Sequence, residues 1–174
     1  EEVTAALPGD ELTPPPVEQC TRAITIAAPP EAVWPWLVQM GADRGGFYSY
    51  AWMENLFGLQ IHNADRIHEE WQQLAVGEPM WGDRRRTGGW VVELVEPNVT
   101  LVLKTADPKT GRVATRDAGI GFEFQWTFAL RPDPRAQDYY LFYYGNDFAA
   151  ALADLYLRDG RPDEAVAILV PLAS

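Results

Sequence analysis

The chain has 174 residues, of which 47% are hydrophobic and 22% charged, and its formal net charge is −11. This composition is typical of one globular domain and excludes an intrinsically disordered chain. An acidic chain without a basic stripe is not expected to bind nucleic acid or to adsorb on anionic membranes. No stretch approaches the roughly 20 apolar residues of a membrane-spanning helix, and no secretory signal is visible.

The cysteine content bears on the compartment and on metal binding. Cys20 is the single cysteine, so an internal disulfide is excluded and a cysteine-ligated zinc site is not expected. A reducing compartment follows, and we predict a cytoplasmic location. No cofactor and no metal are expected.

The first part of the chain predicts an arm, a strand and two helices. Residues 1–20 are acidic and contain four prolines, which favours an extended arm ahead of a single domain over 21–174. Residues 21–29 alternate as a strand does. Residues 30–40 have helical spacing, with Val33, Trp36, Leu37 and Met40 expected to face inward. Residues 49–58 predict a second short helix.

The middle of the chain predicts a series of hairpins. Segments rich in β-branched and aromatic residues are separated by turn signals, and they cover residues 79–86, 89–97, 99–106, 112–116, 122–130 and 139–146. Hairpins in sequence indicate an antiparallel sheet. Residues 147–160 and 161–172 predict helices. We therefore expect an α+β fold in which a bent sheet folds around a terminal helix, and not a parallel Rossmann sheet.

Three motifs resemble the START/Bet v1-like superfamily, which includes polyketide cyclase/dehydrase and lipid-transport proteins. They are "AITIAAPPEAVWPWLVQMGADRGGFYSYAWMENLFG", "IHNADRIHEEWQQLAVGE" and "FEFQWTFAL". The resemblance covers about residues 7–132 and implies a helix-grip fold, in which a curved antiparallel sheet wraps a long C-terminal helix and encloses an apolar cavity. Residues 151–169 resemble instead the helical hairpin of a single tetratricopeptide unit.

Aromatic side chains are the main candidates for ligand binding. Tryptophan and tyrosine combine a large apolar ring with a polar atom, so they line cavities more readily than leucine does. The candidates are Trp36, Tyr48, Tyr50, Trp52, Trp71, Trp81, Trp90, Trp126 and Tyr143. The alternative for each ring is ordinary core packing. The pair Gly45-Gly46 is expected to act as a hinge beside the cavity entrance.

Charged and histidine residues give weaker candidates. Arg84, expected on a strand, could hold a ligand carboxylate or phenolate, and the alternative is a solvated edge strand. His62 and Asp65 could form a general-base pair. On a helix, His62, Asp65 and Glu69 would share one face, but a structural turn is the favoured interpretation over a metal site.

Three hypotheses for function follow. The first is a non-catalytic carrier or sensor that binds a lipid, a polyketide or an aromatic molecule in an internal cavity. The second is an enzyme of the cyclase/dehydratase type, which the resemblance implies. The third is an interaction protein that binds a partner protein through residues 147–174.

Overall fold

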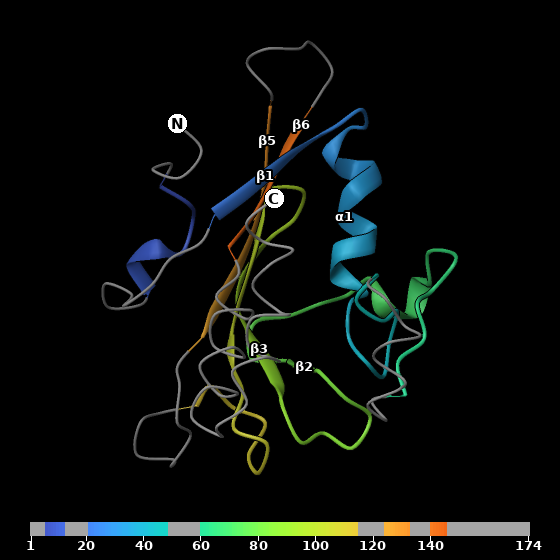
Figure 1. Ribbon diagram of the computed structural model, residues 1–174, viewed down its shortest axis with the longest axis vertical. Coiled ribbons are helices and arrows are strands. Elements are labelled where there is room, and N and C mark those ends of the chain that lie inside the picture. Colours follow the sequence, from blue (N-terminus) through green and yellow to red (C-terminus); the bar gives the residue numbers. More distant parts are fainter. Residues whose placement is uncertain (1–5, 13–20, 49–59, 115–123, 133–139, 146–174) are drawn as a thin grey trace, which may run out of the picture.

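The computed structural model describes residues 6–12, 21–48, 60–114, 124–132 and 140–145 (Figure 1). Its helix α1 covers Pro30–Val38. Its strands are β1 Thr21–Ile26, β2 Pro79–Trp81, β3 Gly89–Glu96, β4 Thr100–Thr105, β5 Gln125–Pro132 and β6 Tyr140–Gly145. Short 3-10 turns lie at Asp10–Leu12 and Glu69–Trp71.

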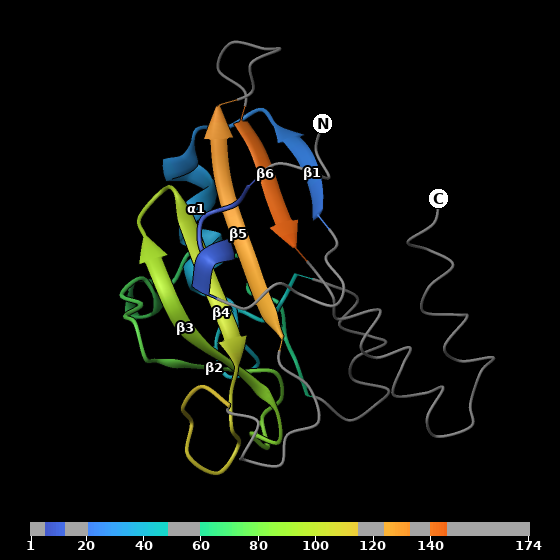
Figure 2. The same cartoon turned by 90° about the vertical axis from the view of Figure 1, so that its left-hand side faces the viewer.

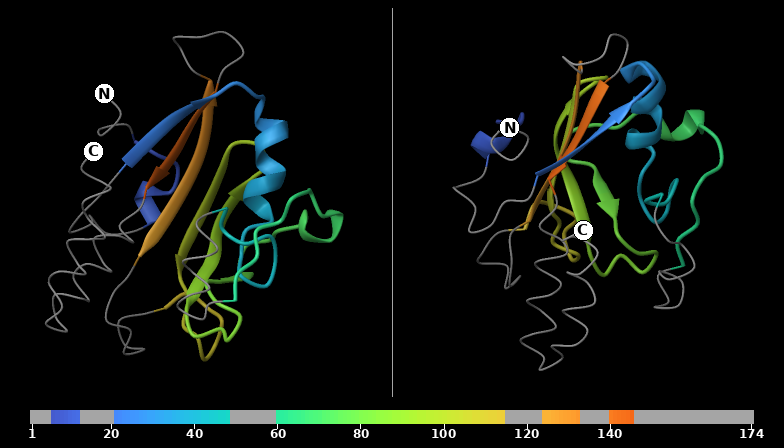
Figure 3. Two further views of the ribbon diagram at one scale, coloured as in Figure 1. Left: turned by 45° about the vertical axis from the view of Figure 1, so that its right-hand side comes forward. Right: turned by 45° about the horizontal axis from the view of Figure 1, so that its top comes forward.

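All the strands belong to one antiparallel sheet, in the order β1-β6-β5-β4-β3-β2 (Figure 2). The consecutive strands β2 to β6 form a meander, and β1 joins it by pairing with β6, from Thr21 opposite Gly145 to Ile26 opposite Tyr140. The expected α+β fold with a twisted antiparallel sheet is confirmed (Figure 3). The second short helix, the C-terminal helix of the helix-grip fold and the tetratricopeptide-like hairpin fall outside the described residues.

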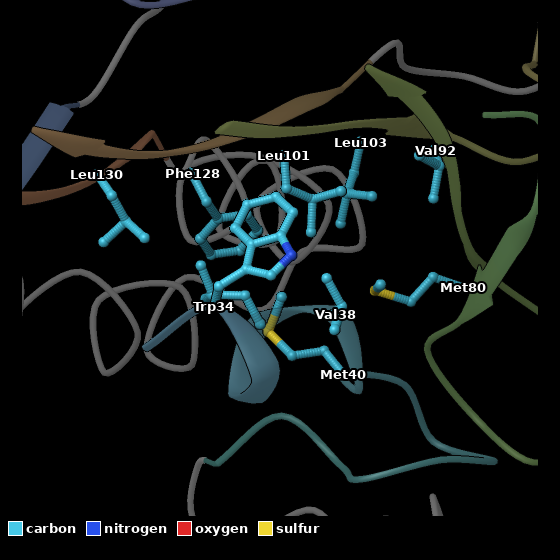
Figure 4. Close-up of a cluster of buried hydrophobic side chains, with 10 residues drawn as sticks. Trp34, Val38, Met40, Met80, Val92, Leu101, Leu103, Phe128 and Leu130 are labelled. Carbon is cyan, nitrogen blue, oxygen red and sulfur yellow. The ribbon is translucent and has the colours of Figure 1, made fainter. Parts of the chain in front are cut away.

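Helix α1 covers one face of the sheet. Pro30 suits the first helical turn, where a missing backbone N–H costs nothing, and Glu31 suits the positive end of the helix. Trp34, Leu37 and Val38 are the buried residues of the helix. They join a cluster that includes Leu101 and Phe128 of the sheet, and Figure 4 shows the Trp34 indole between the helix and these strands. Each aliphatic side chain buried there contributes roughly 1.5–3 kcal/mol.

The helix differs from its prediction in two respects. It ends at Val38, two residues before the expected end. Trp34 faces the core in place of Trp36, which is only partly buried. Because apolar residues occupy nearly every position from Val33 to Val38, their spacing alone does not set the rotation of the helix.

The opposite face of the sheet carries part of the predicted arm. Leu7 packs on Ala129 of β5 in a small buried cluster, and Figure 1 shows the Asp10–Leu12 turn on the side of the sheet away from α1. Side chains of the sheet donate hydrogen bonds to carbonyl oxygens of this segment: Lys104 to Leu12 at 2.7 Å, Gln125 to Gly9 at 2.9 Å and Arg131 to Ala6 at 2.7 Å. Residues 6–12 are therefore fixed to the sheet.

Among the residues that the structure describes, no helix has the length and apolar character needed to cross a membrane.

Candidate functional site: an aromatic cluster on the helix side of the sheet

Five aromatic rings meet on the face of the sheet that α1 covers. Trp90 comes from β3, Trp126 and Phe128 from β5, Phe124 from just before β5, and Phe47 from the loop after α1. We call these residues the aromatic cluster. Leu103 of β4 pairs with Trp126 in the sheet register and belongs to the buried core against which Trp90 and Trp126 pack, so the cluster continues directly into the main core.

The rings contact one another at the distances of attractive aromatic pairs. The centroids of Trp90 and Trp126 are 5.2 Å apart, and those of Trp126 and Phe128 are 4.6 Å apart. The Phe47 ring meets Trp90 edge-on at 5.6 Å and stacks on Trp126 at 6.5 Å. The Phe47 ring thus packs against both indoles, which also contact each other.

The rings of the cluster differ in burial. Phe124 and Phe128 are buried, whereas Phe47, Trp90 and Trp126 are only partly buried and pack against the edge of the core. A partly exposed group of large rings that is continuous with a core is the kind of surface that binds an apolar molecule.

The indole nitrogen of Trp126 lacks a hydrogen-bond partner. Nε1 is closed to solvent, and no acceptor reaches it within the described part of the chain. Native proteins pair the large majority of their buried polar groups, so an exception calls for a physical reason.

The loop that carries Phe47 is held rigidly. Gly41 and Gly46 exchange backbone hydrogen bonds of 2.9 and 2.8 Å, and the amide of Gly45 donates to the carbonyl of Gln39 at 2.7 Å. Gly46 has a φ of +73°, and a Cβ placed there would lie 2.5 Å from Oδ1 of Asn63. Glycine is needed for this close approach, so the structure does not support the expected hinge at Gly45-Gly46.

Gln39 connects this loop to the segment that follows it. Its side chain is fully buried. Nε2 donates to the Tyr48 hydroxyl at 2.6 Å and to the Arg66 carbonyl at 3.1 Å. Oε1 accepts from the amide of His68 at 3.1 Å and from the side chain of Gln72 at 3.3 Å. The amide therefore uses both its donors and its acceptor.

Tyr48 lies beside this network in a strained conformation. Its φ is 55°, its amide donates to Asn63 at 3.0 Å, and its ring meets Trp36 edge-on at 5.6 Å. Burial raises the pKa of the Tyr48 phenol, while the hydrogen bond from Gln39 opposes this rise. The phenol stays protonated at neutral pH. Because its oxygen accepts from Gln39, its proton is left to donate elsewhere.

A second aromatic contact lies in the segment after this loop. The rings of His68 and Trp71 stack with centroids 4.2 Å apart, and the Arg44 guanidinium donates to the Trp71 carbonyl at 2.6 Å. Burial lowers the pKa of Arg44, and the nearby carboxylates of Glu78 and Asp43 oppose this effect.

The arginine-rich segment forms a turn between β2 and β3 and not the expected strand. The buried carboxylate of Asp83 accepts hydrogen bonds from the amides of Arg85, Thr87 and Gly88 and from the Thr87 hydroxyl, at 2.7 to 3.3 Å. These bonds end β2 at Trp81 because they draw the following backbone amides away from the sheet. Arg84 is exposed on this turn and lines no part of the aromatic cluster.

The predicted ligand residues are thus distributed over several places. Trp90 and Trp126 come together in the aromatic cluster. Trp36 contacts Tyr48, Trp71 stacks on His68, and Trp81 is buried beneath the guanidinium of Arg86, 5.7 Å from its ring centroid. Tyr143 lies on β6, and only its backbone position is described; Tyr50 and Trp52 lie outside the described residues.

The weak catalytic candidates, His62 and Asp65, are both exposed, in an irregular segment. No group of three or more His, Cys, Asp or Glu side chains that could hold a metal ion occurs among the residues that the structure describes.

Sequence reasoning missed Gln39 as a member of the site, and it left Phe47 out of the ligand residues because phenylalanine has no polar atom. Gln39 carried a signal, because it is the polar residue in an apolar run that ends at Met40. The partners of Phe47 could not be predicted, since Trp90 and Trp126 lie more than 40 residues away in sequence.

No family model matches the chain, and no curated protein shows significant similarity to it. Three solved structures are similar in fold. Protein MLL2253 from Mesorhizobium loti has 19% identity and a TM-score of 0.42, covering 90% of this chain and 99% of that one. An Aha1 dimer from Colwellia psychrerythraea has 13% identity and a TM-score of 0.43, covering 90% and 93%. A Polyketide_cyc-like protein from Corynebacterium glutamicum has 18% identity and a TM-score of 0.38, covering 89% and 91%. These identities and TM-scores are too low to carry an activity, a ligand or a partner from these proteins to this chain.

Proposed function

We propose that this protein is a carrier or sensor that binds a small hydrophobic molecule over the aromatic cluster. The observation that carries the proposal is the group of three partly buried rings, Phe47, Trp90 and Trp126, beside the main core. The driving force is the removal of apolar surface from water, worth about 25 cal/mol for each Å² buried.

The surroundings of the cluster favour a flat or aromatic ligand. Two indoles inclined at 53° and a phenylalanine ring present their faces and edges to one another, and another ring can join such a group in a stacked or edge-on geometry. The five cluster residues are uncharged, so they offer no group to form an ion pair with a charged ligand. Ligand binding without catalysis is sufficient to account for these features.

Fluorescence of N-phenyl-1-naphthylamine tests the proposal, because this neutral probe brightens when it leaves water. We expect saturable binding to the wild-type chain. Phe47→Ala and Trp90→Ala should each weaken binding about tenfold, since each removes a ring that would contact the probe.

Trp71→Ala is the matched control. It removes an indole that stacks on His68 and lies outside the aromatic cluster, so binding should stay within about twofold of the wild type. Circular dichroism and a cooperative urea transition check that each variant is folded. Equal losses in the Phe47, Trp90 and Trp71 variants, or no saturable binding to the wild type, would contradict the proposal.

A further inference from the structure

The unpaired indole N–H of Trp126 leads to an inference about the chemistry of the ligand, which rests on the proposed function. A buried donor without a partner costs about 1–3 kcal/mol. Among the described residues, the rings that contact Trp126 are those of Phe47, Trp90, Phe124 and Phe128. None of these contacts supplies an acceptor, since phenylalanine rings carry no polar atom and the indole nitrogen of Trp90 only donates.

The polar side chains near Trp126 on the sheet form hydrogen bonds with other groups. Gln125 and Thr127, its neighbours on β5, point to the other face of the strand, where Gln125 donates to the Gly9 carbonyl and to the Thr127 hydroxyl. The Thr105 hydroxyl on the adjacent strand β4 already accepts from the amide of Phe124 and donates to its carbonyl. The described strands therefore provide no acceptor for the Trp126 N–H, which can pair with an acceptor on a bound ligand.

We infer that the ligand carries one neutral hydrogen-bond acceptor, such as a ketone or ester carbonyl, which pairs with Nε1 of Trp126. The rest of the ligand is apolar. A carboxylate is disfavoured, because the cluster residues provide no cation to offset the loss of its hydration. A plain hydrocarbon would leave the indole donor unpaired, so the site selects against it as well.

The acceptor reaches Nε1 through a movement of the Phe47 ring. The nitrogen is closed to solvent. Phe47 is the one ring of the cluster that comes from a loop and not from the sheet or the residue next to it. Its backbone is fixed by the hydrogen bonds around Gly46, so the ring moves by rotation about its own side-chain bonds while the loop stays in place.

A pair of ligands of nearly equal shape tests this inference. In 2-acetylnaphthalene a carbonyl oxygen occupies the position that a methylene group occupies in 2-isopropenylnaphthalene. Affinities of both are measured by tryptophan quenching for the wild type and for Trp126→Phe, which keeps an aromatic ring but removes the N–H. We expect the ratio of the two affinities to shift about fivefold against the ketone in Trp126→Phe.

Trp90→Phe is the matched control, because it removes an indole of the same cluster without touching the unpaired donor. It should lower the affinity for both ligands by the same factor and leave the ratio of the two affinities unchanged. A second measurement on the wild type does not depend on the stability of a variant. In a ¹⁵N–¹H spectrum, the ketone should move the Trp126 indole signal, assigned by its loss in Trp126→Phe, downfield, and the alkene should not.

The outcomes separate the two proposals. If neither naphthalene binds, the proposed function fails. If both bind, but the ratio is the same in Trp126→Phe and the indole signal does not move, the acceptor inference alone is overturned. An indole proton of Trp126 that is already shifted downfield without ligand would also overturn it, because the donor would then have a partner in the free chain.

Discussion

At the scale of single residues, the loop at the site depends on two residues that are not expected to contact the proposed ligand. Gln39 binds four separate groups with one amide. Gly46 supplies a backbone conformation and a close approach that other residues cannot adopt without strain. Both act by positioning the loop that carries Phe47 and Tyr48.

Replacing Gln39 by Leu should lower the free energy of unfolding by about 2–4 kcal/mol, because the Arg66 carbonyl and the His68 amide lose their partner in a buried site. Urea denaturation measures this change. Gln73→Leu makes the same substitution at an exposed position, and it should change stability by no more than about 0.5 kcal/mol. Equal effects of the two substitutions would show that the hydrogen bonds of Gln39 add nothing measurable to the free energy of unfolding.

Replacing Gly46 by Ala should lower the free energy of unfolding by at least about 2 kcal/mol, since φ is positive there and the new methyl group would meet Asn63. Thermal unfolding measures this loss. Gly88→Ala is the control, because a Cβ at that position has no atom within 4 Å and its φ lies outside the left-handed region. A Gly46→Ala variant as stable as Gly88→Ala would refute the tight packing of this loop.

At the scale of secondary-structure elements, alternation and turn signals were enough to predict most of the sheet. Strands β3, β4 and β6 lie within the segments expected from the sequence, and β5 begins three residues later and ends two residues later than its expected segment, 122–130. Strand β2 is much shorter than expected, because the Asp83 carboxylate binds the backbone amides that would have extended it. Hydrogen bonds between a side-chain carboxylate and nearby backbone amides depend on the folded turn, so the sequence alone predicts them poorly.

The candidate site was predictable only in part, for a related reason. Strand alternation places Phe124, Trp126 and Phe128 on one face of their strand, but it does not show that Trp90 shares this face. The contacts of Phe47 with both indoles, and the choice of Trp34 over Trp36 as the core residue of α1, depend on packing between distant segments. Periodicity within one segment carries no information about such packing.

The turn after β2 gives a prediction at this scale. Asp83→Ala should speed hydrogen exchange at the amides of Arg85, Thr87 and Gly88 and lower stability by about 2–3 kcal/mol, because hydrogen bonds to a buried carboxylate are lost. Asp107→Ala, in an exposed turn with a similar bond to the Lys109 amide, should have a smaller effect. Unchanged exchange in the Asp83 variant would exclude this role.

At the scale of the whole molecule, the sheet is covered on both faces by segments from the first part of the chain. Helix α1 packs on one face, and residues 6–12 pack on the other. The segment expected as an arm therefore shields Val102 and Ala129, which are buried, from water.

The same substitution, leucine to alanine, at the buried Leu7 and at the exposed Leu12 tests whether this segment stabilises the sheet. Leu7 is 5% exposed and Leu12 is 36% exposed. Leu7→Ala should lower the free energy of unfolding by about 2–3 kcal/mol, and Leu12→Ala by less than about 1 kcal/mol. Guanidinium denaturation of both variants measures the difference. Similar small losses would mean that the segment adds little to stability.

The pairing of β1 with β6 has a consequence for synthesis in the cell. Ile26 pairs with Tyr140, so more than a hundred residues must leave the ribosome before β1 can find its neighbour. The meander from β2 to β5 can form while translation continues, because each of its strands pairs with the next one made. A nascent chain stalled before Tyr140 would thus display an unsatisfied strand, which is the kind of segment that chaperones bind and that drives aggregation.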